Sequence, residues 1–417
     1  MSRQFTRDVA VIGGCGHVGL PLALTFADLG LRTVIVDIDR AAVASVRAGE
    51  MPFNEEGAPE MLLRVLLRQT LEVCDTPDLI AECQFVVLII GTPVDEHLNP
   101  SFGSIFRALD GCKKHLRAGQ ILILRSTIYP GMSEHVRQYL ADNDLDVAVA
   151  FCPERVAQGH SLREFRQLPQ IISAFDAQTL YEVGQLFGKV APELIEMQPM
   201  EAELCKLMTN AWRYIQFAIV NQFYMIATDN GLDFNRILHA CRHHYPRMAG
   251  MPGPGLTAGP CLVKDTMQLA AFSQNTFVLG HAAMLINEGL PAHLIRLAKR
   301  QTDLRNRTVG ILGMTFKATS DDTRDSLSFK LRKLLTLEAR QILCHDPYAA
   351  EVPDAAPLEK LLAESDVIFL ATPHPEYRDL TIPPDCVVID VWDFLSPSAP
   401  DPVKNRVAKI ALQKVAV

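Results

Sequence analysis

The 417-residue sequence predicts an α/β protein with two doubly wound parallel sheets on either side of a helical centre. Three observations predict this class. A glycine-rich turn follows a short apolar run near the N-terminus, similar apolar runs recur in the last third, and a stretch of about 30 residues between them lacks glycine and proline. We therefore expect two Rossmann-like domains, residues 1–198 and 301–417, joined by a long central helix and further helices within residues 199–300.

The composition argues against several classes of protein. The chain is 48% hydrophobic and 21% charged with a net charge of −8, and no basic block stands out, so nucleic acid is not the expected partner. No stretch has the length and apolarity of a membrane span without polar interruption. The ten cysteines show no CxxC and no metal-ligand spacing, so we expect reduced thiols, no bound metal and a cytoplasmic protein. An anionic small ligand remains compatible with the negative net charge, because a local site can be positive.

The first element is a strand over residues 8–13, followed by a tight turn, a helix over 20–30 and a second strand over 33–37. The turn has the GxGxxG spacing that brings a pyrophosphate close to the backbone at a helix N-terminus. Asp37 lies 18 residues after the last glycine, where an acid binds ribose hydroxyls and favours NAD over NADP. Arg40 could tolerate a 2′-phosphate, or it is simply a solvated helix start. The predicted cofactor contacts of this segment are Gly14, Gly16, His17, Val18, Gly19, Asp37 and Arg40.

Three further apolar runs, at residues 84–90, 120–124 and 146–151, predict parallel strands buried on both faces. Polar residues follow each run, at the carboxyl end where ligands bind in doubly wound sheets. These ends supply the predicted contacts Gly91, Thr92, Pro93, Ser126, Thr127 and Glu154. The last third repeats the pattern at 308–313, 341–346, 366–373 and 386–392 but lacks GxGxxG, so we expect it to bind something other than a dinucleotide.

Between these units, residues 201–230 predict one long helix that ends at Asn230-Gly231. The part from 211 to 227 is apolar on nearly every side, so we expect protein to surround it. Lys206 and Asn210 are four residues apart and therefore share a helical face. A loop rich in glycine and proline follows at 252–265 and contains Cys261, Lys264 and Asp265, which together predict an active site.

The chain resembles the nucleotide-sugar dehydrogenases, that is, the UDP-glucose and UDP-N-acetylhexosamine 6-dehydrogenases, over essentially its whole length. Seven motifs in the family's order support the resemblance. They are GGCGHVGLP at 13–21, GTP at 91–93, STIYPG at 126–131, CPERVAQG at 152–159, EAELCKLMTNAW at 201–212, PGPGLTAGPCLVKD at 252–265 and GMTFKATSDDTRDS at 313–326.

The resemblance implies an NAD-dependent oxidation of a UDP-sugar's C6 alcohol to a carboxylate, with two NAD⁺ reduced. A cysteine thiolate can capture the aldehyde intermediate, and Cys261 is the one cysteine in a Gly/Pro loop with a lysine and an aspartate within four residues. By resemblance, Lys206 and Asn210 stabilise the developing oxyanion, and Asp265 acts as base or positions water. Thr127 and Glu154 match the family's further water-handling pair.

The resemblance also implies a UDP-sugar site and a homodimer formed through the central helix, which makes residues 199–300 a helical dimerisation region. The predicted substrate contacts are Glu154, Arg155, Lys206, Arg247, Gly253, Gly255, Phe316, Lys317 and Arg324. The sugar stays open: Arg155 favours the N-acetylhexosamine branch, the Lys-Asp ending of the cysteine loop favours the glucose branch, and Gln158 replaces a glutamate of many UDP-glucose enzymes. The histidines near Arg247 suggest zinc at first sight, but a basic substrate-side loop fits their spacing better.

Two alternatives remain at this point. A two-electron hydroxyacid dehydrogenase of related architecture would use Lys206 and Asn210 without needing a thiol. A non-catalytic NAD-binding protein could keep the same fold. The number of NADH formed per substrate separates the three hypotheses.

Overall fold

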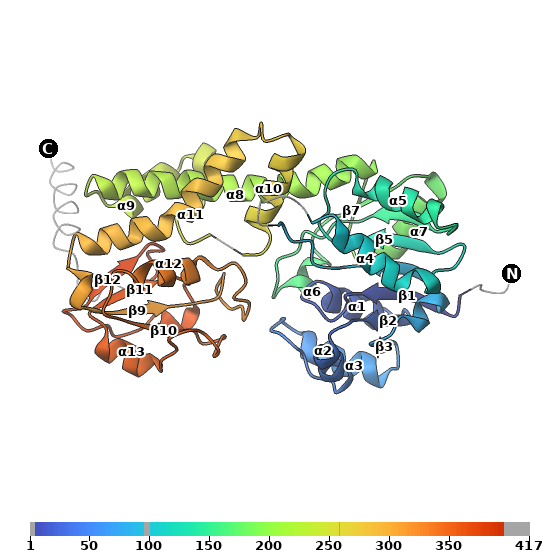
Figure 1. Ribbon diagram of the computed structural model, residues 1–417, viewed down its shortest axis with the longest axis horizontal. Helices are drawn as coiled ribbons and strands as arrows, with labels where there is room; N and C mark the ends of the chain where they lie inside the picture. Colours follow the sequence, from blue (N-terminus) through green and yellow to red (C-terminus); the bar gives the residue numbers. More distant parts are fainter. Residues whose placement is uncertain (1–4, 96–100, 258, 396–417) are drawn as a thin grey trace. The chain divides into compact units, whose positions relative to one another are not determined.

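A computed structural model describes residues 5–95, 101–257 and 259–395 of the chain (Figure 1). The chain forms two compact units. The first comprises residues 1–213 and 262–281, and the second comprises 214–261 and 282–417. The division into three domains at 1–198, 199–300 and 301–417 stays a prediction, and residues 396–417 of the last one lie outside the described part.

The first unit is built on an eight-stranded sheet with the order β3-β2-β1-β4-β5-β6-β7-β8. Its strands are β1 (Arg7–Ile12), β2 (Thr33–Val36), β3 (Leu71–Cys74), β4 (Cys83–Leu88), β5 (Ile121–Leu124), β6 (Ala148–Phe151), β7 (Gln170–Ala174) and β8 (Leu194–Met197). All neighbouring pairs are parallel except β6 and β7, which are antiparallel. The predicted doubly wound parallel sheet is therefore confirmed, with two additional strands of reversed direction at one edge.

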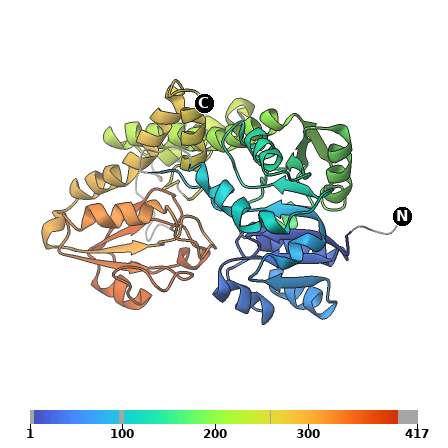
Figure 2. The same ribbon diagram turned by 45° about the vertical axis from the view of Figure 1, so that its right-hand side comes forward.

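Helices cover both faces of this sheet (Figures 1 and 2). Successive side chains of a strand point to opposite faces, and Val9 and Val11 accordingly join one buried apolar cluster while Ala10 joins the other. The helices are α1 (Gly19–Asp28), α2 (Arg40–Arg47), α3 (Ala58–Leu67), α4 (Gly103–Cys112), α5 (Met132–Asp142), α6 (Ser161–Glu164) and α7 (Ala177–Phe187), with short 3₁₀ turns η1 (Asp78–Glu82) and η2 (Lys113–His115).

The predicted central helix is α8 (Pro199–Asp229), 31 residues long and thus about 46 Å. It is followed by α9 (Phe234–Arg242), η3 (Pro246–Met248), α10 (Leu262–Phe272) and α11 (Val278–Lys299). We expected protein to surround α8, and within one chain this is wrong. Met208, Trp212, Ile219, Phe223 and Ile226 are 45–61% exposed.

The second unit contains a four-stranded parallel sheet with the order β10-β9-β11-β12. One helix, α12, lies on one face of this sheet and another, α13, on the other (Figures 1 and 2). The elements are η4 (Leu304–Asn306), β9 (Thr308–Leu312), α12 (Leu327–Leu335), β10 (Gln341–His345), α13 (Leu358–Glu364), β11 (Val367–Leu370), η5 (Pro375–Tyr377) and β12 (Val387–Asp390). The four predicted strands of the last third are thus confirmed.

No helix within the described ranges is both long enough and apolar enough to cross a membrane.

Candidate active site

The glycine-rich turn after β1 is shaped for close approach of a ligand. Gly13 has a φ of +74°, and a Cβ there would lie 1.8 Å from the carbonyl oxygen of Ile89, so only glycine fits. The Asp37 carboxylate accepts hydrogen bonds from the backbone N–H groups of Cys15 (2.9 Å) and Asp39 (3.0 Å), which joins the end of β2 to this turn. Val18 provides no side-chain cap for α1. The N–H of Leu20 already donates to the carbonyl oxygen of Gly16 (2.9 Å), so the glycine-rich turn itself and the very start of α1 are what fit the pyrophosphate of a dinucleotide.

The remaining predicted contacts of this segment flank the turn. The ring of His17 stacks on Phe53 with 4.1 Å between centroids. Arg40 starts α2, and its guanidinium lies 3.6 Å from the carboxylate of Asp75. The observed partner of Arg40 is thus an acid of the same unit, and the Arg40 side chain is itself largely exposed.

The loops after β4 and β5 meet, as predicted from their positions at neighbouring strand ends. The Thr92 hydroxyl donates to the carbonyl oxygen of Thr127 (2.6 Å). The Ser126 hydroxyl accepts from the N–H of Ile90 (2.7 Å) and donates to its carbonyl oxygen (2.8 Å). These bonds hold Gly91–Pro93 and residues 126–127 together at one end of the sheet.

A buried polar cluster lies next to Thr92. The Asp265 carboxylate, fully buried in the first turn of α10, accepts from the Asn210 amide (2.6 Å) and from the Lys264 ammonium (2.6 Å). The same ammonium is 3.4 Å from the Thr92 hydroxyl. Asn210 and Asp265 were predicted. Lys264 was considered only as a cationic neighbour of Cys261, and its contact with a residue 172 positions away leaves no local signal in the sequence.

Lys206 is half-buried on α8, one turn before Asn210. A second residue on this face, Glu203, was missed. Its buried carboxylate accepts from the N–H groups of Gly131 (2.5 Å) and Ser133 (2.9 Å), and burial raises its pKa. Glu203 thereby fixes the face of α8 that carries Lys206 and Asn210 against the start of α5.

Glu154 is not a free carboxylate. It forms a buried ion pair with Arg125 and accepts from the N–H groups of Arg155 (2.6 Å) and Val156 (2.8 Å). The Arg155 guanidinium donates to the carbonyl oxygen of Pro169. The predicted role of Glu154 must therefore include Arg125, which the sequence interpretation left unassigned.

Cys261 is the one exposed cysteine of the ten, all of which lie in the described part. It stands immediately before the first residue of α10. Burial raises the pKa of Cys15 and of Cys152 to about 12, which keeps these thiols protonated. Exposure and position at a helix start thus distinguish Cys261 from the remaining cysteines.

The predicted substrate contacts of the second unit fall into two groups. Near the cysteine loop, a Cβ on Gly259 would lie 2.6 Å from the Phe316 ring, so the two segments touch. Phe316 donates through its N–H to the carbonyl oxygen of Asp322 (3.1 Å), and the Arg324 guanidinium forms a two-pronged pair with the Asp322 carboxylate (2.9 and 2.6 Å). Lys317 belongs to the same loop, and its carbonyl oxygen accepts from the Thr315 hydroxyl (3.0 Å).

The other group is dispersed. Gly255 exchanges two hydrogen bonds with the Asn221 amide (2.9 and 3.1 Å). Gly253 is exposed, and the Arg247 guanidinium lies 5.6 Å from the Tyr245 ring centroid. These contacts do not connect Arg247 or Gly253 with the Phe316 loop.

The second unit's counterpart of the glycine-rich turn is closed by its own side chains. Asp346, at the end of β10, accepts from the N–H groups of Met314 (2.6 Å) and Thr315 (2.9 Å) and pairs with the fully buried His374 (3.0 Å). Asp346 therefore joins the end of β10 to the turn after β9, as Asp37 joins the end of β2 to the turn after β1.

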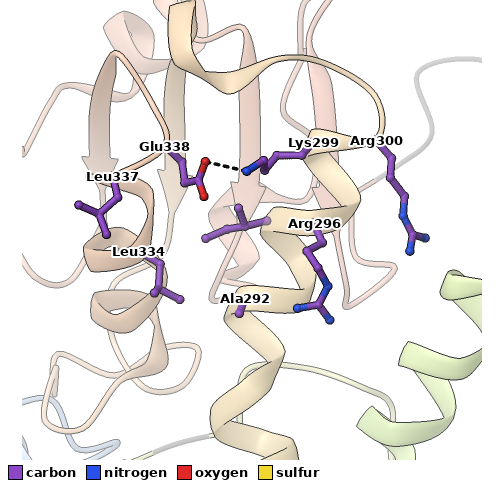
Figure 3. Close-up of a pocket in the computed structure, with 8 residues that line it drawn as sticks. Ala292, Arg296, Lys299, Arg300, Leu334, Leu337 and Glu338 are labelled. Carbon is purple, nitrogen blue, oxygen red and sulfur yellow. Dashed lines mark hydrogen bonds and ion pairs between the residues drawn. The ribbon is translucent and has the colours of Figure 1, made fainter.

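A hollow of about 480 Å³ in the second unit lies elsewhere, between α11 and the end of α12 (Figure 3). Its walls combine apolar side chains with Arg296 and Arg300, and the Lys299–Glu338 ion pair (2.8 Å) crosses it. No predicted site residue lines it. Across the described residues, no group of three or more His, Cys, Asp or Glu side chains is placed to hold a metal.

Comparison with known proteins identifies the family. Three models of the UDP-glucose/GDP-mannose dehydrogenase family match in order: the NAD binding domain over residues 7–191, the central domain over 200–288 and the UDP binding domain over 310–397.

Individual relatives agree with these matches. The UDP-N-acetyl-D-mannosamine dehydrogenase of Pyrococcus horikoshii is 27% identical over 89% of this chain and 90% of its own length. An NDP-N-acetyl-D-galactosaminuronic acid dehydrogenase of Ralstonia nicotianae is 26% identical, with coverage of 90% and 92%.

Two solved structures are also similar. A UDP-D-ManNAc dehydrogenase from Pyrococcus horikoshii superposes with a TM-score of 0.87, 26% identity and coverage of 95% and 97%. A UDP-glucose dehydrogenase from Pyrobaculum islandicum superposes with a TM-score of 0.85, 26% identity and coverage of 94% and 96%. The chain belongs to the UDP-glucose/GDP-mannose dehydrogenase family and is an NAD-dependent nucleotide-sugar dehydrogenase.

Proposed function

We propose that this enzyme oxidises the C6 alcohol of a UDP-hexose to the carboxylate, in two successive oxidations without releasing the aldehyde. The observation that carries the proposal is the buried cluster of Asp265, Asn210 and Lys264 on α8 and α10. The exposed Cys261 precedes this cluster's Lys264 by three residues in the sequence. A two-electron dehydrogenase would have no use for an exposed thiol at this place.

The proposed chemistry is balanced as follows. Bound NAD⁺ supplies the two-electron acceptor in each oxidation, and two NADH result. The Cys261 thiolate adds to the aldehyde carbon and forms a thiohemiacetal, whose oxidation gives a thioester. Water then attacks the thioester carbon and the C–S bond breaks, which regenerates the thiolate, forms the carboxylate product and releases two protons.

Each residue of the cluster has a proposed part. Lys206 and Asn210 donate to the oxygen at C6 as it gains charge, a kind of interaction worth about 3–4 kcal/mol for a positioned donor. Asp265 takes the alcohol proton or orients the attacking water. Lys264 keeps Asp265 in place and links it to Thr92. The start of α10 favours an anion at Cys261. Thr127 is proposed to handle water, and Glu154 to do so together with Arg125.

The NAD site is proposed at the turn after β1, with Gly14, Gly16 and Gly19 against the pyrophosphate and Asp37 against the adenosine ribose. The loops at 91–93 and 126–127 face the other half of the dinucleotide. We propose that the UDP-sugar is held by Arg155, Lys206, Arg247 and the loop of Phe316, Lys317 and Arg324. Among sugars, UDP-N-acetyl-D-mannosamine is the first candidate, because several relatives carry that substrate in their names.

We also propose a homodimer through α8. Six large apolar residues of α8 are exposed, and five of them, all except Met200, fall within about 60° of one another around the helix, since successive residues are rotated by about 100°. A continuous apolar stripe of this kind matches a second copy of itself. None of the ten cysteines, all of which lie in the described part, forms a disulfide, and this supports a cytoplasmic location.

A substrate panel tests the function. Purified enzyme with NAD⁺ is offered UDP-N-acetyl-D-mannosamine, UDP-N-acetyl-D-glucosamine, UDP-glucose and the TDP-hexoses, and NADH and uronate are quantified. Formation of two NADH per uronate with one of the UDP-sugars supports the proposal. One NADH with a released carbonyl product, or no NADH with any sugar, contradicts it.

Light scattering tests the dimer. Phe223→Glu places a charge in the middle of the stripe and should produce monomers. Leu67→Glu, at an 85% exposed leucine of α3, is the matched control and should leave the mass unchanged. A wild-type monomer, or a Phe223→Glu dimer, contradicts the proposed interface.

A further inference from the structure

Gln268 is a buried polar residue that the mechanism above does not use. It is 1% exposed, on α10 one turn after Asp265, and its amide oxygen has no hydrogen-bond partner among the described residues. An unpaired buried carbonyl oxygen costs about 1–3 kcal/mol, so such groups normally receive a donor from water or a ligand.

Gln268 lines a small pocket in the first unit. Thr92, Pro93, Ser101 and Tyr129 are among the other lining residues, and the remaining space is about 10 Å³, room for roughly one water-sized group. Two of these residues, Thr92 and Pro93, follow β4 and are predicted cofactor contacts.

The position of the pocket along the sheet indicates which half of the cofactor it meets. A dinucleotide lies across the carboxyl ends of the strands at the point where the strand order reverses, here between β1 and β4. Asp37, at the end of β2, marks the adenosine side. Thr92, at the end of β4, is therefore on the nicotinamide side. The contact of Lys264 with Thr92 (3.4 Å) places the Asp265 cluster on that side too.

We propose that the Gln268 amide oxygen accepts a hydrogen bond from the carboxamide N–H of bound NAD and so sets the rotation of the nicotinamide ring. The carboxamide carries the only N–H donors of this half of the cofactor. The inference rests on NAD as the cofactor and is independent of the sugar and of the thioester route. A water molecule is the competing donor, and the experiment separates the two.

The experiment measures binding in the absence of sugar, by calorimetry, for NAD⁺ and for 3-acetylpyridine adenine dinucleotide. The analogue replaces the carboxamide by an acetyl group and has no N–H to donate. Gln268→Met, a variant of similar volume without the acceptor, should weaken NAD⁺ binding about tenfold and leave binding of the analogue unchanged. Gln268→Glu keeps an acceptor and should retain the preference for NAD⁺. Gln138→Met, at an exposed glutamine of α5, is the control and should alter neither affinity.

Two results would overturn the inference. Equal weakening of both dinucleotides would mean that Gln268 only packs, and unchanged affinity for both would assign its partner to water. Because binding is measured without turnover, the experiment decides the role of Gln268 even if the enzyme is inactive on every sugar. Thermal midpoints of the variants confirm that each is folded, and Gln268→Leu, which also lacks the acceptor, replaces Gln268→Met if that variant does not fold.

Discussion

Replacing Asp265 by asparagine should destabilise the first unit through the charge that it leaves behind. The carboxylate is fully buried and neutralises the Lys264 ammonium, whose side chain is only 15% exposed. Asp265→Asn keeps the shape but leaves that ammonium without its counter-charge. The second substitution Lys264→Met removes the stranded charge and should therefore restore stability.

The structure sets the size of the effect. Removing one partner of a buried ion pair costs about 3–5 kcal/mol, and the slight exposure of Lys264 favours the lower end, about 3 kcal/mol. In a unit of this size, 1 kcal/mol shifts the thermal midpoint by about 2–4 °C, so Asp265→Asn should lower it by about 6–12 °C. Asp265→Asn/Lys264→Met should recover roughly half of that loss, because it leaves no unpaired charge.

Differential scanning calorimetry of wild type, Asp265→Asn, Lys264→Met and the double variant measures this coupling. Glu134→Gln, which breaks the half-exposed pair with Arg137 on α5, is the matched control and should leave the midpoint unchanged. A shift below 2 °C for Asp265→Asn, or a double variant less stable than Asp265→Asn alone, would refute the reasoning. Either result would mean that Asp265 and Lys264 do not form the buried pair.

Three further predictions concern the cofactor site, the thiols and the second unit. Asp37→Ser should lower kcat/KM for NAD⁺ about tenfold and raise it for NADP⁺, since the carboxylate that disfavours a 2′-phosphate is gone. Steady-state kinetics with both cofactors measures this, and an unchanged preference for NAD⁺ would contradict the assignment of Asp37. Iodoacetamide at neutral pH should label Cys261 and spare Cys15, whose pKa burial raises to about 12; peptide mass spectrometry that finds Cys15 labelled first would contradict this assignment. Burial opposes ionisation of Asp346, but the hydrogen bond and charge of His374 prevail and lower its pKa from 3.8 to about 2. Its contribution to stability is therefore complete above about pH 4 and is lost as the pH falls toward 2, and Asp346→Asn should flatten the thermal midpoint over that interval.

Long apolar runs made the sheet predictable. Strands β1, β4 and β5 are buried on both faces, so their sequences are continuous apolar stretches that end in polar loops. Strands β3 and β8 lie at the edges of the sheet and contain exposed acidic residues, and β7 is the strand that pairs antiparallel with β6. Short edge strands leave a weak pattern, which is why β3 and β8 were missed. Strand β7 is fully buried between β6 and β8, so its omission has no such explanation.

The candidate site was predictable where chemistry follows local spacing. Lys206 and Asn210 share a helical face, and Asp265 follows Cys261 by four residues, so their grouping could be read directly. Contacts between residues distant in sequence could not be predicted in this way. The pairing of Glu154 with Arg125 and the capping of α5 by Glu203 arise from packing of separate elements. The sequence therefore pointed to Glu154 without its partner Arg125, and it gave Glu203 no role.

The most direct test of the central claim counts NADH formed per enzyme active site and per UDP-sugar consumed, for wild type and for Cys261→Ser. The account predicts two NADH per sugar for wild type and no more than one for Cys261→Ser, because the second oxidation needs the sulfur-bound intermediate. Cys241→Ser, at a half-buried cysteine of α9, should behave as wild type. Two NADH per sugar from Cys261→Ser, at an undiminished rate, would contradict the account.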